Sequence, residues 1–330
     1  MSDADDSAGL FLGIDVGGTD VKVGLVNKRG SIVHRSRKAT TELGSPENVF
    51  RFAVDFANKT LKATANSQRL LAAGVAVPGV LDTNSFVLKE VVNLPGWQGV
   101  PLRDQLADVS QLKSIVVNDA NGAAFAEHAI RQMQNASLGL VTLGTGVGCG
   151  VVVGGGPCGG DHGCAGELGH ITIDFSDSAL ECTCGSKGHL ETYAGANGVV
   201  RRTRELLKAV DADDPWLHQD FTPLDVAQRA ESGDNTCLQV IDQTAVYIGR
   251  AIGLMGQVID PAVVLLGGAM TFGGADSIVG ERFLAAVRAS VKSSTLVQVG
   301  ENIKIEFASL GNDAGMIGAG MLAKSICSGL

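Results

Sequence analysis

The chain has 330 residues, more than one hydrophobic core usually organises, so two domains are expected. Hydrophobic residues make up 45% and charged residues 18%, which excludes an intrinsically disordered chain. With 26 Lys and Arg against 35 Asp and Glu, the formal net charge is −9, and this opposes a broad nucleic-acid-binding surface. A small anion site built from backbone amides is still compatible with that charge.

The ends and the cysteines of the chain bear on its location. The first residues, Met1 to Asp6, are acidic and lack the basic and apolar regions of a signal peptide. The longest apolar runs, such as Pro261–Leu266, are too short to span a bilayer. Seven cysteines is an odd count, and they are expected to be reduced thiols or metal ligands. We therefore expect a cytoplasmic protein that binds no membrane.

The first part of the chain alternates apolar strands with glycine turns and helices. A helix is expected from Pro46 to about Ala65, capped by Ser45, with an apolar face towards the core made by Phe52, Phe56 and Leu61. The other expected elements are strands at 10–16, 21–27, 31–37, 71–77 and 115–117, and a helix over 120–130.

The second part begins with a weak internal repeat. Residues 138–153 repeat the strand, glycine turn and strand of residues 10–27. Two such turns, one from each domain, could hold opposite sides of a triphosphate. The elements expected after it are a Cys/His segment (160–191), helices near 195–210, 223–231 and 236–258, strands at 263–266 and 303–308, and a helix from Asp313.

The first glycine turn carries a candidate phosphate site. Gly17 and Gly18 let backbone amides point at phosphate oxygens, and Thr19 adds a hydroxyl donor. Lys22 could neutralise phosphate charge, and Asp15 could hold Mg²⁺ through water. An ordinary glycine hairpin with a capping Asp explains the same residues about equally well.

Later glycines follow apolar strands in the same way. A turn is expected at Gly144, Thr145 and Gly146. Alone it is weak evidence for a phosphate site, and it becomes a candidate only when it is paired with the first glycine turn. A strand follows this turn, which excludes the strand-to-helix fingerprint of dinucleotide-binding proteins. Gly267 and Gly268 end another apolar strand.

Asn118 and Asp119 end one expected strand and begin a helix. Ligands of α/β folds bind at the carboxyl ends of strands, so Asp119 is a candidate general base for a hydroxyl that attacks phosphorus. The commoner role of such an aspartate is to cap the helix, and Asn118 would then have no role.

Two cysteines and two histidines in one loop predict a structural zinc site. Cys182 and Cys184 are spaced Cys-x-Cys, and His170 and His189 lie near them in sequence. A metal-free loop is the alternative. It is less favoured because reduced cysteines usually lie buried in strands or helices. Other donors in the segment, His162, Cys158 and Cys164, are weaker rivals for the same metal.

In this order, the motifs resemble the ROK family (repressors, uncharacterised frames and sugar kinases), and most of all its glucokinase branch. The resemblance covers the chain from about Leu10 to the last helix. The matching segments are Asp15–Lys22, Asn93–Trp97, Asn118-Asp119, Leu143–Gly148, Glu167–His170, Cys182–Glu191 and Gly311–Gly315.

The resemblance implies an α/β protein with an actin-like ATPase (ribonuclease H-like) fold, in which two α/β domains surround a central cleft. The small N-terminal domain would be residues 1–118 plus about 312–330, and the larger domain, residues 119–311, would carry the zinc knuckle. Some family members form dimers or tetramers, so a homo-oligomer is expected, and nothing in the sequence fixes the number of subunits.

The resemblance also implies ligands. ATP and Mg²⁺ would bind with the phosphates between the turns at 17–19 and 144–146, and with Gly267 and Gly268 near the nucleoside. A structural Zn²⁺ would bind His170, Cys182, Cys184 and His189. The sugar would contact polar groups of Gly79, Asn93, Asn118, Asp119, Glu167, His170 and Glu191.

Two positions depart from the family pattern. His189 stands where the knuckle usually has a third cysteine, which leaves the ligand set of the metal open. Asp20 stands where the first motif often has Asn, Lys or Arg, and it could weaken a nucleotide contact.

The implied function is an ATP-dependent hexose kinase, foremost a glucokinase with Asp119 as general base. An N-acetylhexosamine kinase, a fructokinase and polyphosphate as donor remain open, because the motif residues are shared. A transcriptional regulator of the family would need a helix-turn-helix, and the 14 residues before Asp15 are acidic and too few for one. A non-catalytic actin-like ATPase is a further alternative, and it would not need Glu167, His170 and Glu191.

Overall fold

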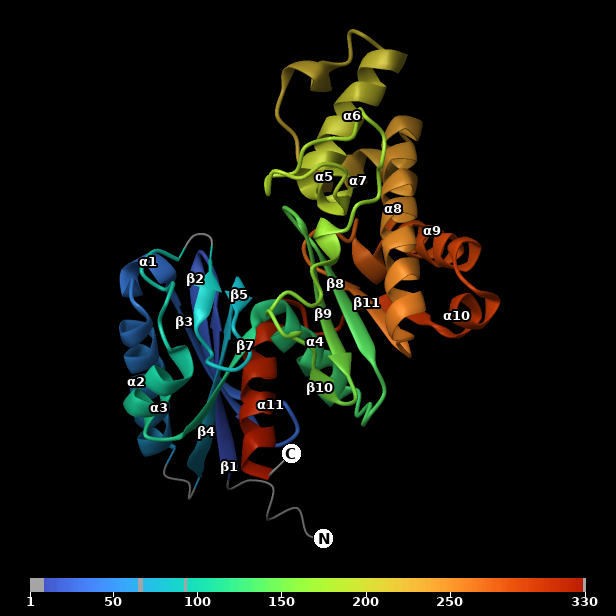
Figure 1. The fold of residues 1–330 in the computed structure, drawn as a ribbon. Helices are drawn as coiled ribbons and strands as arrows, with labels where there is room; N and C mark the ends of the chain where they lie inside the picture. Colours follow the sequence, from blue (N-terminus) through green and yellow to red (C-terminus); the bar gives the residue numbers. More distant parts are fainter. Residues whose placement is uncertain (1–8, 65–67, 92–93, 329–330) are drawn as a thin grey trace. The chain divides into compact units, whose positions relative to one another are not determined.

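The structure is a computed structural model that describes residues 9–64, 68–91 and 94–328. The contacts between residues divide the chain into two compact units. Unit 1 comprises residues 1–136, 150–166 and 310–330, and unit 2 comprises residues 137–149 and 167–309. Both are mixed α/β units (Figure 1). No helix in the described part of the chain is long and apolar enough to cross a membrane.

Unit 1 is organised by a five-stranded sheet in the order β3-β2-β1-β4-β7. Its first three strands are antiparallel, whereas β4 and β7 run parallel to β1. The strands are β1 (Gly9–Val16), β2 (Asp20–Asn27), β3 (Ile32–Ala39), β4 (Arg69–Val77) and β7 (Lys113–Asn118). Because β1, β4 and β7 are parallel, the residues that follow them lie at one edge of the sheet.

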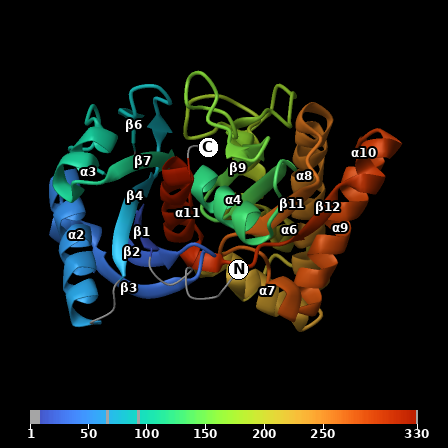
Figure 2. The same cartoon turned by 90° about the horizontal axis from the view of Figure 1, so that it is seen from below.

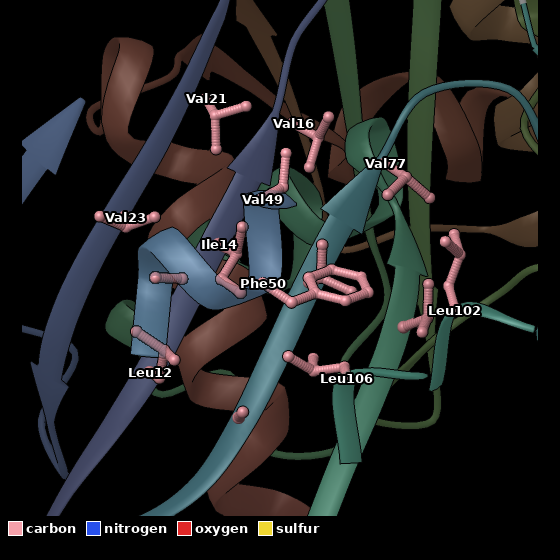
Figure 3. Packing of buried hydrophobic residues seen from close by; sticks show 14 of the residues in the cluster. Leu12, Ile14, Val16, Val21, Val23, Val49, Phe50, Val77, Leu102 and Leu106 are labelled. Carbon is pink, nitrogen blue, oxygen red and sulfur yellow. The ribbon is translucent and has the colours of Figure 1, made fainter. Parts of the chain in front are cut away.

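One face of this sheet carries the main hydrophobic core of unit 1 (Figure 3). Side chains alternate between the two faces along a strand, so Leu12 and Ile14 of β1 both point to this core. The helices on this side are α1 (Thr40–Leu43), α2 (Pro46–Ala63) and α3 (Leu102–Ser110). The sequence analysis did not foresee α3, whose Leu102 and Leu106 are fully buried.

Helix α2 begins as expected and buries a different stripe. The Ser45 hydroxyl accepts a hydrogen bond from the Asn48 amide, and this caps the helix. The buried positions are Pro46, Val49, Phe50, Ala53 and Ala57. The expected core residues Phe52, Phe56 and Leu61 are only partly buried beside this stripe. These three residues pack against the core, as expected, but the centre of the buried stripe is Phe50, which lies edge-to-face with Trp97 at 6.4 Å.

Helix α11 (Ala314–Ser328) covers the other face of the sheet (Figure 2). It lies close enough that a side chain at Gly13 of β1 or Gly74 of β4 would collide with its backbone carbonyls. Helix α4 (Asp119–Ile130) packs beside α11. The Glu127 carboxylate of α4 is buried, and it accepts hydrogen bonds from Arg131 and from the Leu310 amide.

These contacts bear on the expected division of the chain after Asn118. They group residues 119–136 and 150–166 with unit 1, whereas the sequence analysis assigned both segments to the larger domain. The physical reason is the packing of α4 on α11 and the Glu127–Leu310 bond. Unit 1 also contains two short strands, β5 (Val80–Leu81) and β6 (Leu88–Glu90).

A second sheet has the order β10-β9-β8-β11-β12. Its strands are β8 (Leu138–Leu143), β9 (Val147–Val153), β10 (Gly156–Pro157), β11 (Val263–Gly267) and β12 (Lys304–Phe307). Both sheets place their strands in the same sequential order, third-second-first-fourth-fifth, and in both the fourth strand is parallel to the first and the fifth. The repeat expected between residues 10–27 and 138–153 is therefore the start of two sheets of like topology.

Helices make up most of the remainder of unit 2. They are α5 (Leu190–Ala194), α6 (Ala196–Val210), α7 (Pro223–Glu231), α8 (Asn235–Ile259), α9 (Ile278–Ser294) and α10 (Val297–Asn302). The helices α6, α7 and α8 lie close to their expected positions, whereas α9 and α10 were not expected. Helix α9 packs along α8, and a side chain at Gly249 of α8 would meet Ser290 of α9.

Candidate active site

Asn118, and not Asp119, is the residue that caps α4. The Asn118 side-chain oxygen accepts a hydrogen bond of 3.2 Å from the Asn121 amide, which satisfies an open donor of the first turn. Asp119 is the first helical residue and is partly buried. The capping role that competed with the catalytic reading of Asp119 is therefore taken by its neighbour.

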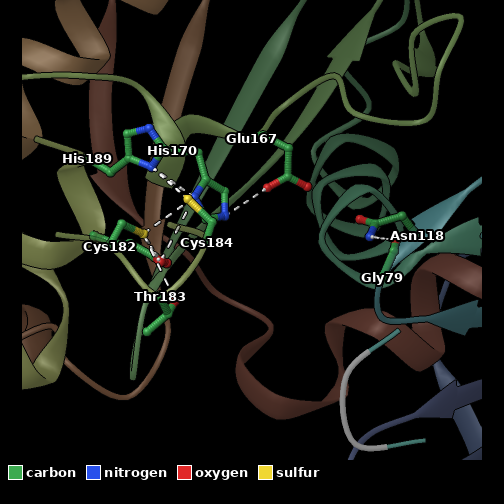
Figure 4. A network of polar contacts seen from close by, with 9 residues as sticks. Gly79, Asn118, Glu167, His170, Cys182, Thr183, Cys184 and His189 are labelled. Carbon is green, nitrogen blue, oxygen red and sulfur yellow. Dashed lines mark hydrogen bonds and ion pairs between the residues drawn. The ribbon is translucent and has the colours of Figure 1, made fainter. Parts of the chain in front are cut away.

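Gly79 lies beside Asn118 at the same edge of the sheet. The Asn118 side-chain amide donates to the Gly79 carbonyl at 3.1 Å (Figure 4). Gly79 has a φ of 99°, and a side chain there would collide with the Glu90 carbonyl oxygen, so only glycine fits. The structure thus brings Gly79, Asn118 and Asp119 together, while Asn93 lies outside the described residues.

The first glycine turn is held by Thr40. The Thr40 hydroxyl donates to the Gly17 carbonyl at 2.7 Å, and its amide donates to the Thr19 carbonyl at 2.8 Å. The Gly17 amide donates a hydrogen bond to the Asp20 carbonyl within the turn. This amide is therefore already bonded, whereas the sequence analysis expected it to bind phosphate. Among the described residues, the Gly18 and Thr19 amides have no hydrogen-bond partner. The anion-binding capacity of the turn therefore rests on Gly18 and Thr19.

Asp15 and Lys22 face one another at the base of this turn. They are paired in the β1–β2 register, and their side chains form an ion pair of 3.2 Å. Lys22 also donates to the Asn312 carbonyl at 2.8 Å. Burial raises the pKa of Asp15, and the Lys22 ammonium lowers it by less. A side chain at Gly315 would meet the Asp15 carboxylate at 2.8 Å, so the start of α11 leaves room for that group.

The glycine segments of unit 2 lie side by side. Strands β8 and β11 are parallel neighbours, with Thr142 opposite Gly267, so the turns that follow them share one edge of the sheet. Gly268 has a φ of 90° and packs against the Leu143 carbonyl. The Gly144 carbonyl accepts the Ala196 amide at 2.9 Å. This bond ties the turn 144–146 to the start of α6.

Glu191 lies over the same turn. A Cβ at Gly146 would be 2.5 Å from a Glu191 carboxylate oxygen, so Gly146 is the residue that admits this side chain. Glu191 is in α5, directly after the Cys/His loop. The other Glu191 carboxylate oxygen is 3.1 Å from the Cys182 sulfur and 4.0 Å from the His170 Nδ1. One carboxylate thus connects the glycine turn with the cluster of cysteines and histidines.

His170, Cys182, Cys184 and His189 form one cluster, with all four ligand atoms within 4.8 Å of one another (Figure 4). The two Nδ1 atoms are 3.3 Å apart, and the Cys184 sulfur is 3.3 Å from the His189 Nδ1. The Cys182 sulfur is 3.8 Å from the His170 Nδ1. A backbone hydrogen bond at Ser186 lowers the pKa of the exposed Cys184 thiol, whereas burial raises the pKa of Cys182.

These separations fit a tetrahedral zinc site. Zinc–sulfur bonds of about 2.3 Å and zinc–nitrogen bonds of about 2.0–2.1 Å place tetrahedral ligand atoms roughly 3.3–3.8 Å apart. Both imidazoles present Nδ1 to the cluster, so the Nε2 atom of His170 points away from it, 3.9 Å from the Glu167 carboxylate. The four-residue group contains neither His162 nor Cys158 nor Cys164.

A hydrogen-bonded pair that sequence reasoning missed supports this loop. The Tyr193 hydroxyl donates to Asp174 at 2.6 Å and accepts from the Leu180 amide at 2.9 Å. The buried Arg202 donates to the Tyr193 carbonyl at 3.2 Å. Burial and the bond to Asp174 raise the pKa of Tyr193. Asp174 and Tyr193 lie far apart in the loop and belong to no local pattern, so no sequence signal marked them.

The comparisons with known proteins agree over nearly the whole chain. A profile of the ROK family matches residues 11–326. The chain is 33% identical over 323 residues to a glucokinase of Halalkalibacterium halodurans, covering 95% of this chain and 94% of that protein. It is 29% identical over 313 residues to an N-acetylmannosamine kinase of Escherichia coli O157:H7, covering 95% and 98% of the two chains.

Solved structures show the same likeness. A ROK hexokinase from Thermus thermophilus matches with a TM-score of 0.79 at 27% identity, over 97% of this chain and 100% of that one. A ROK family glucokinase from Streptomyces griseus, in complex with glucose and AMPPNP, matches with a TM-score of 0.69 at 26% identity, over 96% and 100%. The fold is the expected actin-like ATPase fold, and the chain belongs to the ROK family.

Proposed function

We propose that this protein is an ATP-dependent hexose kinase that converts glucose to glucose 6-phosphate. The observation that carries the proposal is the division of roles at the start of α4, where Asn118 caps the helix and Asp119 is the first helical residue at the carboxyl end of β7. The glucokinase relative at 33% identity supports glucose as the sugar, and the glucokinase solved with glucose and AMPPNP supports ATP as the donor.

In the proposed reaction, the Asp119 carboxylate accepts the proton of the sugar hydroxyl as its oxygen attacks the γ-phosphorus. The new O–P bond forms while the bond between the γ-phosphorus and the bridging oxygen breaks, and ADP leaves. The Gly18 and Thr19 amides and Lys22 would bind phosphate oxygens on unit 1, and the turn 144–146 would bind them on unit 2. Bound near Asp15, Mg²⁺ would supply charge neutralisation on the phosphates.

We assign recognition of the sugar to Gly79, Asn118, Asp119, Glu167, His170 and Glu191, with Asn93 retained from the sequence analysis. These groups are hydrogen-bond donors and acceptors suited to ring hydroxyls. A sugar that lacks one of the hydroxyls would leave a polar group unpaired, which discriminates strongly against it.

We further propose that the cluster of two cysteines and two histidines holds a structural Zn²⁺. The metal would fix the His170 ring through Nδ1 and leave Nε2 for a sugar hydroxyl. It would also fix the loop that leads into Glu191. Cys182 would then be a thiolate, and its proton would no longer be shared with the Glu191 carboxylate.

A kinetic panel tests the function. Purified protein is supplied with ATP, Mg²⁺ and glucose, fructose, mannose, N-acetylglucosamine or N-acetylmannosamine, and ADP release is measured. We expect the highest kcat/KM with glucose. The N-acetylmannosamine kinase relative makes that sugar the second candidate. Highest kcat/KM with N-acetylmannosamine would replace glucose by that sugar, and no sugar-dependent ADP release from any member of the panel would overturn the proposed function.

A further inference from the structure

A pocket outside the proposed sugar site lies between the edge strand of the first sheet and the start of α11. It has a volume of about 450 Å³ and lies wholly within unit 1. Its lining residues are Lys22, Arg35, Ser36, Arg37, Asn312, Asp313 and Met316. Liquid water occupies about 30 Å³ per molecule, so the pocket has room for an anion with more than one phosphate group.

The charge of the residues that line this pocket is opposite in sign to the net charge of the chain. The formal net charge of the protein is −9, yet the pocket is lined by three cations and by a single carboxylate. The antiparallel register explains this gathering. Lys22 is paired with Arg37, and Gly24 with Arg35, so both arginines and Lys22 emerge on the face of the sheet that α11 covers. Gly24 itself adds no side chain there, and Met316 of α11 packs directly over it.

The three cations differ in what they bind. Lys22 is engaged by Asp15 and by the Asn312 carbonyl, and Arg35 forms an ion pair of 3.0 Å with Asp313. The Arg37 side chain has no hydrogen bond or ion pair with any described residue. Its guanidinium is therefore available to a ligand, and a planar fork of N–H donors suits phosphate oxygens.

We propose that this pocket is an accessory site for phosphoanions, with Arg37 as its principal ligand and Arg35 as the second. Asp313 opposes such an anion and competes with it for Arg35. Lys22 belongs both to this pocket and to the proposed phosphate site at the first glycine turn, so the two sites are adjacent. The anion has two sources: a free phosphate ion, or the chain of an inorganic polyphosphate that extends from the glycine turn.

Isothermal titration calorimetry tests the binding itself, with inorganic phosphate and with tripolyphosphate as probes and without sugar. We expect at least one probe to bind the wild-type protein. Arg37→Ala should weaken binding about tenfold through the loss of a charge-assisted hydrogen bond, whereas Arg37→Lys, which keeps the charge and loses the planar fork, should weaken it by less. Arg69→Ala is the matched control, because Arg69 is an exposed arginine of unit 1 outside the pocket, and it should change nothing.

Asp313→Asn gives an independent readout in the opposite direction. Removal of the one carboxylate frees Arg35 and should tighten anion binding severalfold, with a steep loss of affinity as sodium chloride is raised. No binding of either probe, or equal binding by Arg37→Ala and the Arg69→Ala control, would overturn the proposal. A melting curve confirms that each variant is folded.

Two arms separate the sources of the anion, and the donor arm rests on the proposed kinase function. If polyphosphate phosphorylates glucose and Arg37→Ala raises the KM for polyphosphate while kcat/KM for ATP stays within about twofold, the pocket extends the donor site. If tripolyphosphate or phosphate binds beside saturating AMPPNP and is not a donor, the pocket takes a free phosphoanion. A protein without kinase activity whose anion binding still depends on Arg37 would retain this site and lose only the proposed function.

Discussion

Asp119 is the residue on which the proposed chemistry depends most. Its place at the first position of α4 resembles an ordinary capping aspartate, and only the neighbouring Asn118 shows that the cap is already supplied. Its catalytic assignment therefore rests on its position at the carboxyl end of β7, where ligands of α/β folds bind.

Replacing Asp119 with Asn should abolish this basicity while keeping the shape of the side chain. General base catalysis contributes about 10²–10⁴-fold, so kcat should fall by that factor while ATP binding is preserved. Steady-state ADP release measures kcat, and calorimetry measures ATP binding. Asp108→Asn, an exposed aspartate of α3, serves as the control. Near-wild-type turnover by Asp119→Asn would remove the residue from the mechanism.

His189 decides whether the Cys/His cluster is a metal site. Purified protein should carry close to one zinc per chain. His189→Ala should lose the metal and raise the KM for the sugar, with less effect on ATP, because the loop before Glu191 is no longer fixed. His189→Cys should retain zinc, since four-coordinate zinc accepts three cysteines and one histidine.

Elemental analysis of the purified variants and sugar kinetics provide the two readouts for this cluster. His218→Ala, an exposed histidine of unit 2, should leave both unchanged. A chelator that strips the metal from the wild-type protein should reproduce the His189→Ala kinetics. Stoichiometric zinc in His189→Ala would mean that another side chain completes the site.

At the scale of elements, the close packing of α11 on the sheet is the most restrictive contact of unit 1. A methyl group at Gly74 would collide with the Ala319 carbonyl of α11, and neither backbone can move without displacing a strand or a helix. Gly74→Ala should lower the free energy of unfolding by about 1–3 kcal/mol. Gly156→Ala, where a Cβ meets open space, should change it by less than about 0.5 kcal/mol. Denaturant unfolding compares the two, and equal effects would refute the account.

An ion-pair network joins three helical segments of unit 2. Arg229 of α7 donates to Asp214, before the short helix Pro215–His218, and to Asp234, the N-cap of α8. The Arg229 hydrogen bonds hold the pKa of Asp214 below its usual value of 3.8. The pKa of Asp234 is lowered as well: burial raises it, but the Cys237 amide and Arg229 together lower it by more. This network fixes the first turn of α8.

The sign of the pH dependence follows from the lowered pKa of Asp214. Below about pH 4 the unfolded chain binds more protons than the folded one, so the stability from this pair is complete near pH 7 and is lost as pH falls through the folded pKa. Asp214→Asn should lower the free energy of unfolding at pH 7 by about 1–3 kcal/mol and flatten its acid dependence. Asp220→Asn, at a fully exposed side chain, should do neither. An unchanged acid slope in Asp214→Asn would contradict the assignment.

Regular elements with strong local signals could be predicted from the sequence, and their boundaries agree within a few residues. Ser45-Pro46 marks the start of α2, and apolar runs mark β1, β4, β8 and β11. Helix α3 and helix α9 were missed although both carry apolar residues at helical spacing, such as Leu102 and Leu106 in α3 and Val279, Phe283 and Val287 in α9. The central core residue of α2 was not foreseen, because Phe50 packs against Trp97, which is distant in sequence.

The candidate site divides in the same way. Motifs of adjacent residues, such as Asn118-Asp119 and Cys182-Thr183-Cys184, supplied the candidate residues, and the two cysteines do lie together with His170 and His189. The residues that hold these motifs in place could not be predicted. Thr40 holds the first glycine turn, and Tyr193 and Asp174 hold the cysteine loop, through contacts between segments that no sequence pattern links.

The whole molecule contains two sheets of like strand order whose insertions differ. Along the chain, α2 lies between β3 and β4 of the first sheet. The loop that carries the cysteines and histidines, together with α5 to α8, lies between β10 and β11 of the second sheet. The same framework therefore presents a glycine turn twice, at 17–19 and at 144–146. The second copy alone adds the cluster of His170, Cys182, Cys184 and His189.

The last helix should be essential to this architecture. Removal of residues 310–330 would uncover the face of the first sheet that Phe11, Ala72 and Ala323 share, and would leave the buried Glu127 carboxylate without the Leu310 amide. We expect the truncated protein to aggregate or to lose the cooperative unfolding of the complete chain. Circular dichroism and size-exclusion chromatography measure both, and a truncated protein with wild-type melting behaviour would contradict this expectation.

The chain order of α11 has a consequence for how the protein is made. On a ribosome, β1 and β4 emerge early, whereas the helix that covers their second face is translated after all of unit 2. At about 5–20 residues per second, that face waits roughly ten seconds or more for its cover. During this interval the nascent chain exposes apolar strands. The yield of folded protein in a cell should therefore depend on ribosome-associated chaperones and on translation speed, and not only on the stability of the finished fold.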